Sequence, residues 1–509
     1  MEGAGAALLL SPGYIWTQLS RTHLDLYHRL LPINTVVRAL AVDVAVLWLA
    51  AALATGWLER MAGGRWTGGE QGRGSLAGLV WALWLGLLAS RIVAGLIVAQ
   101  VLDWQELSAG RVFAVAAGLL AVLWALTPRG YGLLVRGLRF VILLLGFSMV
   151  WALPTLVAAG FAQQPHDRAA FQRAVASTQH QRVVWLLFDE MSYNQAFDHR
   201  WPGLQLPHFD RLRGESVTFS DMQPDGYFTD HVIPSLFLGR PMADIRSTEA
   251  GVLLYQTARG GTWAAFDGSA TIFADAQRRG WTTGVSGEFN PYCRMLENQL
   301  DWCWMQLDPF GDHLSRDKTT WQNVASPAEA MWARARHQRF ERVFSVADDY
   351  DDMMKAGREL AADENIDFAF VHLYLPHPPG YYDRKTGRVG TGGSYIDNLA
   401  LADRALGEMM EAIEQTGRAG TTTLVISSDH SWRVGIWRHA FGWTKEDELA
   451  SEHGRFDPRP VLMVHFPGED SGAPFGHAVP LLAMHGMLEG ILAGQIGDAQ
   501  QLEAWAARQ

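Results

Sequence analysis

Cysteine is scarce in this chain. Its 509 residues include two, Cys293 and Cys303, which lie within one short segment of the second half. A pair at this spacing can close a small disulfide loop, which would suit an oxidising compartment, and two buried thiols are the alternative. The disulfide interpretation favours an extracytoplasmic location for this part of the chain.

Concentrated basic charge is also lacking. The chain has 42 Lys and Arg against 53 Asp and Glu, a formal net charge of -11, and no long Lys/Arg block. This balance argues against a nucleic-acid partner. Internal repeats and low-complexity stretches are absent as well. Residues 1–31 lack the charged start and the long apolar run of a cleavable signal peptide.

What the chain has instead is a strongly apolar first part, mostly Leu, Ala, Val, Gly and Trp up to Phe161. A membrane span needs roughly twenty apolar residues. Four segments approach this requirement, near Thr35–Trp57, Leu76–Leu102, Val112–Leu126 and Leu133–Ala159. We expect residues 1–161 to form a transmembrane helix bundle. Tyr14–Leu31 would precede it as an interfacial helix, with Trp16 and Tyr27 as anchors.

The placement of arginine predicts the orientation of this bundle. The links after the first and third segments carry arginines, whereas the link after the second is acidic around Asp103 and Glu106. The positive-inside rule then places everything after the fourth segment outside the cytoplasm, although Arg21, Arg29 and Arg38 favour the opposite orientation. We therefore expect residues 162–181 to be a linker and residues 182–509 to form an extracytoplasmic catalytic domain.

Two apolar runs after residue 181 end abruptly in metal-binding residue types. Arg182–Glu190 (RVVWLLFDE) ends in Asp189 and Glu190, and Thr422–Asp429 (TTLVISSD) is followed at once by His430. Such runs are typical of buried parallel strands, whose carboxyl ends meet at the edge of the sheet where ligands bind. An isolated strand end with solvated acids would be unremarkable. Two such strands together predict a metal site.

A loop between these strands carries candidate nucleophiles. Pro224–Pro241 contains the hydroxyls of Thr229 and Ser235, and Pro234 with Ser235 predicts the start of a helix there. A hydroxyl just before a helix N-terminus is well placed to meet a phosphate, but Ser235 could equally be an ordinary helix cap. His377 lies between prolines after another strand and is a candidate phosphate or metal contact.

Strands and helices alternate through this half, which predicts a doubly wound α/β domain. The predicted strands are Val217–Phe219, Thr282–Ser286, Phe368–Leu373 and Val461–Phe466, and the predicted helices are Phe209–Gly214, Thr271–Arg279, Pro327–Ala347 and Tyr395–Thr416.

Six pieces taken in order resemble the alkaline phosphatase and sulfatase superfamily. They are VVWLLFDE, IPSLFLGR after a threonine loop, FVHLYLPHPP, YIDNLALADRALGEMM, LVISSDH and RPVLMVHFPG, and they cover Arg182–Gly468. The resemblance implies a divalent metal, zinc or manganese, held by Asp189, Thr229, Asp429 and His430, with Glu190 as an alternative ligand. It further implies that Thr229 attacks a phosphodiester and forms a phospho-threonine intermediate. Further candidates for metal or phosphate contacts are His377, His439 and His453.

With the predicted spans in front, the chain looks like the membrane-anchored members, such as lipoteichoic acid synthases and phosphoethanolamine transferases. This resemblance implies an integral protein of the bacterial inner membrane with a periplasmic catalytic domain. It would move a phosphoglycerol- or phosphoethanolamine-like group from a phospholipid donor to an envelope glycan or lipid acceptor. The alternatives are a phosphodiesterase or phosphatase, a sulfuric ester hydrolase, and a catalytically silent scaffold of the envelope.

Several positions depart from the patterns of the superfamily. Sulfatases carry Cys or Ser two residues before the proline of a Pro-Ser-Arg motif, whereas this chain has Val232 there and Leu236 in place of the arginine. A formylglycine-dependent sulfatase is therefore disfavoured. Ser431 replaces the glycine that usually follows the Asp-His pair, and the spacing from Thr229 to Pro234 differs from that of the phosphoethanolamine transferases.

Overall fold

The structure is a computed structural model that describes residues 27–61, 137, 140, 154, 157–158, 160–248, 250–307, 314–336, 346–390, 392–440, 442–469 and 472–509. The chain forms two compact units. The first comprises Met1–Arg21, Pro32–Gln164 and His313–Gln338, and the second comprises Thr22–Leu31, Pro165–Asp312 and Arg339–Gln509.

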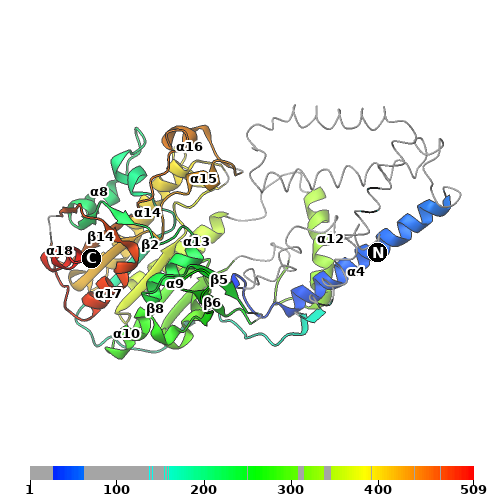
Figure 1. Cartoon of the computed structure of the whole chain (residues 1–509), viewed down its shortest axis with the longest axis horizontal. Helices are drawn as coiled ribbons and strands as arrows, with labels where there is room; N and C mark the ends of the chain where they lie inside the picture. The colour runs from blue at the N-terminus through cyan, green and yellow to red at the C-terminus, as the bar shows by residue number, and fades with distance from the viewer. Residues whose placement is uncertain are drawn as a thin grey trace. The chain divides into compact units, whose positions relative to one another are not determined.

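In the first unit, the helix α4 (Asn34–Met61) packs against α12 (Thr320–Arg336), which comes from much later in the chain (Figure 1). The predicted span Thr35–Trp57 falls within α4. The predicted spans Leu76–Leu102 and Val112–Leu126, and most of Leu133–Ala159, lie outside the described residues. Within the described part of the chain, no helix has the length and apolar character needed to cross a membrane. The transmembrane bundle therefore stays a prediction.

The second unit is built on a mixed sheet, which in the described part of the chain has nine strands in the order β1-β9-β8-β10-β2-β13-β14-β3-β15. The central strands β8, β10, β2 and β13 are parallel to one another, and antiparallel strands lie toward both edges. The bounds are β1 Ala170–Gln172, β2 Arg182–Phe188, β3 Val217–Phe219, β8 Thr283–Glu288, β9 Trp302–Gln306, β10 Phe368–Leu373, β13 Thr422–Ser427, β14 Leu462–His465 and β15 Pro474–Phe475.

Helices cover both faces of this sheet, because alternate residues of the central strands enter two separate cores. Val184, Leu186 and Phe188 of β2 pack with α8, α13 and α14, whereas Val183 and Trp185 pack on the opposite face with α9, α10 and α17 (Figure 1). The bounds are α8 Pro207–Gly214, α9 Thr229–Leu238, α10 Ile272–Arg278, α13 Val346–Ala362, α14 Tyr395–Glu414 and α17 Met484–Leu492. The predicted doubly wound α/β architecture is confirmed.

Smaller elements surround this framework. The short sheets are β5 Asp244–Ser247 with β6 Leu253–Gln256 and β7 Ala264–Ala265, β11 Tyr382–Asp383 with β12 Arg388–Val389, and β4 Met222–Gln223 with β16 Val479–Pro480. Among the described residues, the remaining α-helices are α11 Tyr292–Met295, α15 Val434–Trp437, α16 Lys445–Ala450 and α18 Ala499–Ala506. Cys293 and Cys303 are joined by a disulfide that ties α11 to β9, with 5.7 Å between the Cα atoms.

Two predicted helix starts are wrong, and both errors come from a proline. The helix predicted to begin at Pro234 begins at Thr229, and the helix predicted over Pro327–Ala347 is α12, which begins at Thr320. Each proline lies inside its helix. The serine beside each one donates its hydroxyl hydrogen to the carbonyl four residues earlier, Ser235 to His231 and Ser326 to Gln322. These serines are therefore interior residues and not N-caps.

A buried arginine joins β2 to the end of α13. Arg182 is completely buried, and its guanidinium donates to the backbone carbonyls of Leu360, Ala361, Asp363 and Ile366. These carbonyls lie at the C-terminal end of α13, where a cation is also favoured by the helix dipole. Burial lowers the pKa of Arg182 to about 10. These hydrogen bonds hold the first residue of β2, the strand that Asp189 follows, against the end of α13.

Replacing this side chain with an uncharged one of similar length should destabilise the domain. In Arg182→Met the carbonyls lose a buried charged donor, so we expect the free energy of unfolding to fall by about 3–5 kcal/mol. Equilibrium urea unfolding would measure the change. Arg211→Met is the matched control, because Arg211 pairs with Glu414 at the exposed surface, and it should cost less than about 1 kcal/mol. Equal losses in the two variants would contradict the role given to Arg182.

Candidate active site

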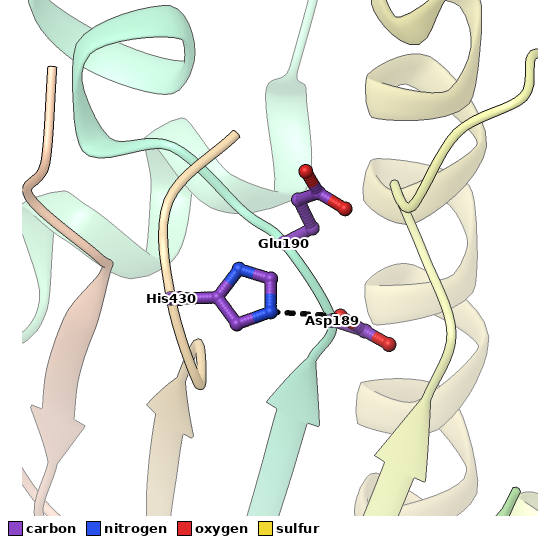
Figure 2. A group of neighbouring side chains, drawn as sticks. All are labelled: Asp189, Glu190 and His430. Carbon is purple, nitrogen blue, oxygen red and sulfur yellow. Dashed lines mark ion pairs between the residues drawn. The ribbon is translucent and has the colours of Figure 1, made fainter. Parts of the chain in front are cut away.

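The site is built at the carboxyl ends of three neighbouring parallel strands, β10, β2 and β13. Leu373 of β10 pairs with Phe188, and Ser427 of β13 pairs with Leu187, so the three strands end nearly level. Asp189 follows β2 directly, and His430 lies three residues beyond the end of β13. Both side chains are buried and face each other, with 3.9 Å between His430 Nε2 and Asp189 Oδ1 (Figure 2).

The hydroxyl of Thr229 joins these groups from the N-terminus of α9. Its Oγ1 lies 3.5 Å from Asp189 Oδ1 and 3.5 Å from His430 Nε2, and the residue is 5% exposed. A helix N-terminus is favourable for an anion because its amides are free and its dipole is positive there. Ser235, the other candidate nucleophile, lies more than a turn further along and donates its hydroxyl hydrogen within the helix. The structure brings Thr229, and not Ser235, to the predicted ligands.

Asp429 places a further buried carboxylate beside His430. Its Oδ1 accepts hydrogen bonds from the backbone amides of Glu190 and His430, which fixes the carboxylate. Its Oδ2 lies 3.3 Å from His430 Nε2, is buried, and has no hydrogen-bond partner among the described residues. Two ligands of a tetrahedral zinc ion are about 3.4 Å apart when each lies about 2.1 Å from it. The unsatisfied oxygen and its spacing from the imidazole therefore fit a cation site.

Glu190 also offers an oxygen within 4.8 Å of Asp189 and His430, but it is already paired. Its Oε2 accepts from Arg433 Nη2 at 2.8 Å, and its Oε1 accepts from the amide of Arg433 and from Trp437 Nε1. Glu190 has a left-handed backbone with φ of 65°. Figure 2 shows its carboxylate directed away from the ring of His430. Both oxygens of Glu190 are thus hydrogen-bonded, whereas Asp429 keeps an oxygen with no hydrogen-bond partner among the described residues.

The carboxyl groups of Asp189 and Asp429 differ in their tendency to ionise. Burial opposes ionisation of Asp189, but the neighbouring His377, His372 and His430 hold its pKa well below its usual range. Burial, and then the negative charge of Asp189, raise the pKa of Asp429. Two carboxylates in one buried site repel each other, so one carries the charge and the other tends to keep a proton. A bound cation would favour ionisation of both.

The remaining predicted residues lie at different distances from this cluster. His377 Nε2 lies 3.5 Å from Glu190 Oε2 and 3.0 Å from Arg433 Nη2, so it borders the site. His439 is half-buried and lies just beyond α15. The side chain of His453 is 71% exposed and pairs with Glu448.

The structure adds residues that sequence reasoning did not assign to the site. Arg433 forms an ion pair with Glu190 and Trp437 donates a hydrogen bond to it, and their position a few residues after the Asp-His pair is the signal that could have identified them. His372 is completely buried, and its Nε2 lies 3.8 Å from Asp189 Oδ2. Its place near the end of β10, the strand next to β2, is a comparable signal.

The two positions that depart from the sulfatase motif belong to the hydrophobic core. Val232 is 2% exposed and Leu236 is 1% exposed, and both pack in the core cluster between α9 and the sheet. Neither side chain is available for chemistry at the strand ends. The position where a sulfatase would carry its formylglycine is a packing position here.

Comparison with known proteins identifies the family to which this domain belongs. The sulfatase family model matches residues 181–468, which is more than half of the chain. The chain therefore belongs to the sulfatase family, within the alkaline phosphatase and sulfatase superfamily. It is an enzyme that acts on sulfate or phosphate esters. No curated protein sequence matches it significantly.

Three solved enzyme structures are similar to this chain at low sequence identity. The PsFucS1 sulfatase from Pseudoalteromonas sp. is 15% identical over 62% of this chain and 68% of its own, with a TM-score of 0.40. The phosphonate monoester hydrolase of Agrobacterium radiobacter is 14% identical over 62% of this chain and 74% of its own, with a TM-score of 0.39. Murine ectonucleotide pyrophosphatase/phosphodiesterase 5 is 11% identical over 64% of this chain and 99% of its own, with a TM-score of 0.35.

The assignment of ligands makes a specific prediction about metal content. Asp429→Asn should lose most of its bound divalent metal, because an amide is a poor substitute for the unpaired carboxylate oxygen. Glu190→Gln should retain the metal, because the carboxylate of Glu190 accepts hydrogen bonds from Arg433 and Trp437. Elemental analysis of the purified proteins by mass spectrometry would measure this. Full occupancy in Asp429→Asn, with loss in Glu190→Gln, would reverse the assignment.

Proposed function

We propose that this chain is a metal-dependent phosphotransferase that uses Thr229 as its nucleophile. The observation that carries the proposal is the position of Thr229 Oγ1, at 3.5 Å from both Asp189 Oδ1 and His430 Nε2, at the N-terminus of α9. A divalent metal held by Asp189, Asp429 and His430 would lower the pKa of this hydroxyl and stabilise charge on the phosphoryl oxygens.

The reaction would proceed in two displacements at phosphorus. In the first, the bond from Thr229 Oγ1 to phosphorus forms while the bond from phosphorus to the diacylglycerol oxygen breaks, and the threonine proton ends on the released diacylglycerol. In the second, the hydroxyl oxygen of an acceptor bonds to phosphorus, the threonine oxygen leaves, and it takes up the acceptor's proton. The chain's own contribution is to orient the hydroxyl and to place it where the helix dipole favours the anionic group.

A phosphate ester is favoured over a sulfate ester by the residues of α9. The sulfatase nucleophile would stand at Val232, which is buried in the core, whereas an unmodified threonine faces the strand ends. The sulfuric ester hydrolase thus becomes the weaker alternative. Thr229, Asp429 and His430 also converge, which argues against a catalytically silent scaffold.

The rest of the sequence supports a proposed donor and a proposed location. The apolar segments within residues 1–161 favour a phospholipid donor with a phosphoglycerol- or phosphoethanolamine-like head group. The acceptor would be an envelope glycan or lipid. The arginine placement and the pairing of Cys293 with Cys303 favour a catalytic domain on the periplasmic side of a bacterial inner membrane.

The nucleophile can be tested by trapping the intermediate. Full-length protein incubated with phosphatidylglycerol or phosphatidylethanolamine vesicles should carry a phosphoglycerol or phosphoethanolamine group on the peptide containing Thr229, as peptide mass spectrometry would show. Thr229→Ala should reduce turnover at least about a thousandfold. Ser235→Ala is the matched control and should remain active. An adduct on Ser235, or turnover in Thr229→Ala, would contradict the assignment.

The acceptor distinguishes a transferase from a hydrolase. With octyl glucoside as the acceptor probe, release of diacylglycerol from the same vesicles should rise at least about tenfold, and the head group should appear on the glucoside, because an alcohol bound in the site attacks at high effective concentration. Thin-layer chromatography with mass spectrometry would identify both products. Equal release without the glucoside, with a free phosphorylated head group, would support a phosphodiesterase instead.

A further inference from the structure

A short segment from the start of the chain is part of the second unit, which holds the candidate active site and is called the catalytic unit below. Tyr27 and Leu31 are completely buried in it, although the chain then leaves for the first unit and returns at Pro165. Arg294 donates from Nη2 to the carbonyl of Tyr27 at 2.6 Å and pairs through Nη1 with Asp167 at 2.5 Å. Asp167 in turn accepts the amide of Leu31 at 2.8 Å. The position of Tyr27 is therefore fixed by a buried charged pair.

The hydroxyl of Tyr27 begins a line of buried polar groups. It donates to Asn290 Oδ1 at 3.1 Å, and Asn290 Nδ2 donates to the hydroxyl of Tyr292 at 3.4 Å. The hydroxyl of Tyr292 lies 2.8 Å from His372 Nδ1. All four residues are completely buried. The sulfur of Met295 also lies 2.9 Å from the Tyr27 hydroxyl, but a thioether is a weak acceptor.

The donors along this line all point in one direction. Because Asn290 donates to the oxygen of Tyr292, the Tyr292 hydrogen is available for His372 Nδ1, and the imidazole then carries its hydrogen on Nε2. That nitrogen is buried, has no hydrogen-bond partner among the described residues, and lies 3.8 Å from Asp189 Oδ2. The carbonyl of Glu288, at 3.1 Å, is the other group facing Nδ1. Loss of the Tyr292 hydroxyl would leave Nδ1 to donate to that carbonyl and would turn a lone pair toward Asp189.

We propose that Tyr27, Asn290 and Tyr292 are positioning residues that orient the carboxylate of Asp189 through His372. A segment that precedes the predicted membrane spans thereby takes part in shaping the metal site. The inference rests on the proposed function in one respect, which is that Asp189 is a metal ligand. Partners that orient a ligand in this way commonly change metal affinity by 10–100-fold when they are removed.

The test is to titrate Mn²⁺ into metal-stripped full-length protein and to measure the dissociation constant by calorimetry. Tyr292→Phe should weaken binding about tenfold, and Tyr27→Phe, which is further along the line, about threefold. If the residues act in series, the double variant should bind no more weakly than Tyr292→Phe alone. Each change removes one oxygen and preserves the ring, so the fold is kept.

Tyr350→Phe is the matched control, because the buried hydroxyl of Tyr350 has no hydrogen-bond partner among the described residues. Its Mn²⁺ affinity should equal that of the wild type. Asp189→Asn supplies the reference for a lost ligand. Unchanged or tighter binding in Tyr27→Phe and Tyr292→Phe, or losses that simply add, would overturn the positioning inference while Asp189→Asn still loses the metal. Wild-type affinity in Asp189→Asn would overturn the ligand assignment, and this inference with it.

Discussion

The repulsion between two buried carboxyl groups, those of Asp189 and Asp429, is the constraint on which the arrangement of the site depends. Both lie at the ends of adjacent parallel strands, where their mutual repulsion is weakly screened. The nearby guanidinium of Arg433 forms its ion pair with Glu190, and it also attracts the charges of Asp189 and Asp429. Imidazoles and backbone amides supply part of the compensation, and Asp429 Oδ2 keeps no hydrogen-bond partner among the described residues. The negative charge of the two carboxylates that remains uncompensated would favour a bound cation at this site.

The fold brings these groups together because strand pairing and helix packing position whole elements, and the side chains at the ends of those elements are positioned with them. Parallel pairing of β10, β2 and β13 brings His372, Asp189 and His430 to one edge of the sheet, and the buried Arg182 fixes where β2 begins. On the other face, packing of Val232 and Leu236 into the core holds α9 so that its first residue, Thr229, reaches the same edge. The candidate nucleophile and the candidate ligands are thus aligned by the same hydrophobic burial that stabilises the domain.

Local sequence patterns were sufficient for the parts of the site that lie on regular strands. The apolar runs that end at Phe188 and Ser427 correctly predicted β2 and β13, and the residues that follow them proved to lie together. Pro234 indicates a helix start, whereas α9 begins at Thr229, because packing of the whole helix tolerates the hydrogen bond that the proline removes. Tyr27 was expected at a membrane interface. Its contact with Asn290 spans 263 positions, and no local pattern reports a contact of that length.

The buried position of Tyr27 also bears on how the catalytic unit holds together. Leu31 and Asp167 are 136 positions apart, yet the amide of each residue is hydrogen-bonded to the other residue. Closing a long loop costs entropy that grows only as the logarithm of its length, so a large intervening segment adds little to the cost once its ends are joined. The paired Arg294 and Asp167 supply that closure within the catalytic unit itself. The unit can therefore accept a long apolar segment between Leu31 and Asp167 while the line from Tyr27 to Asp189 stays in register.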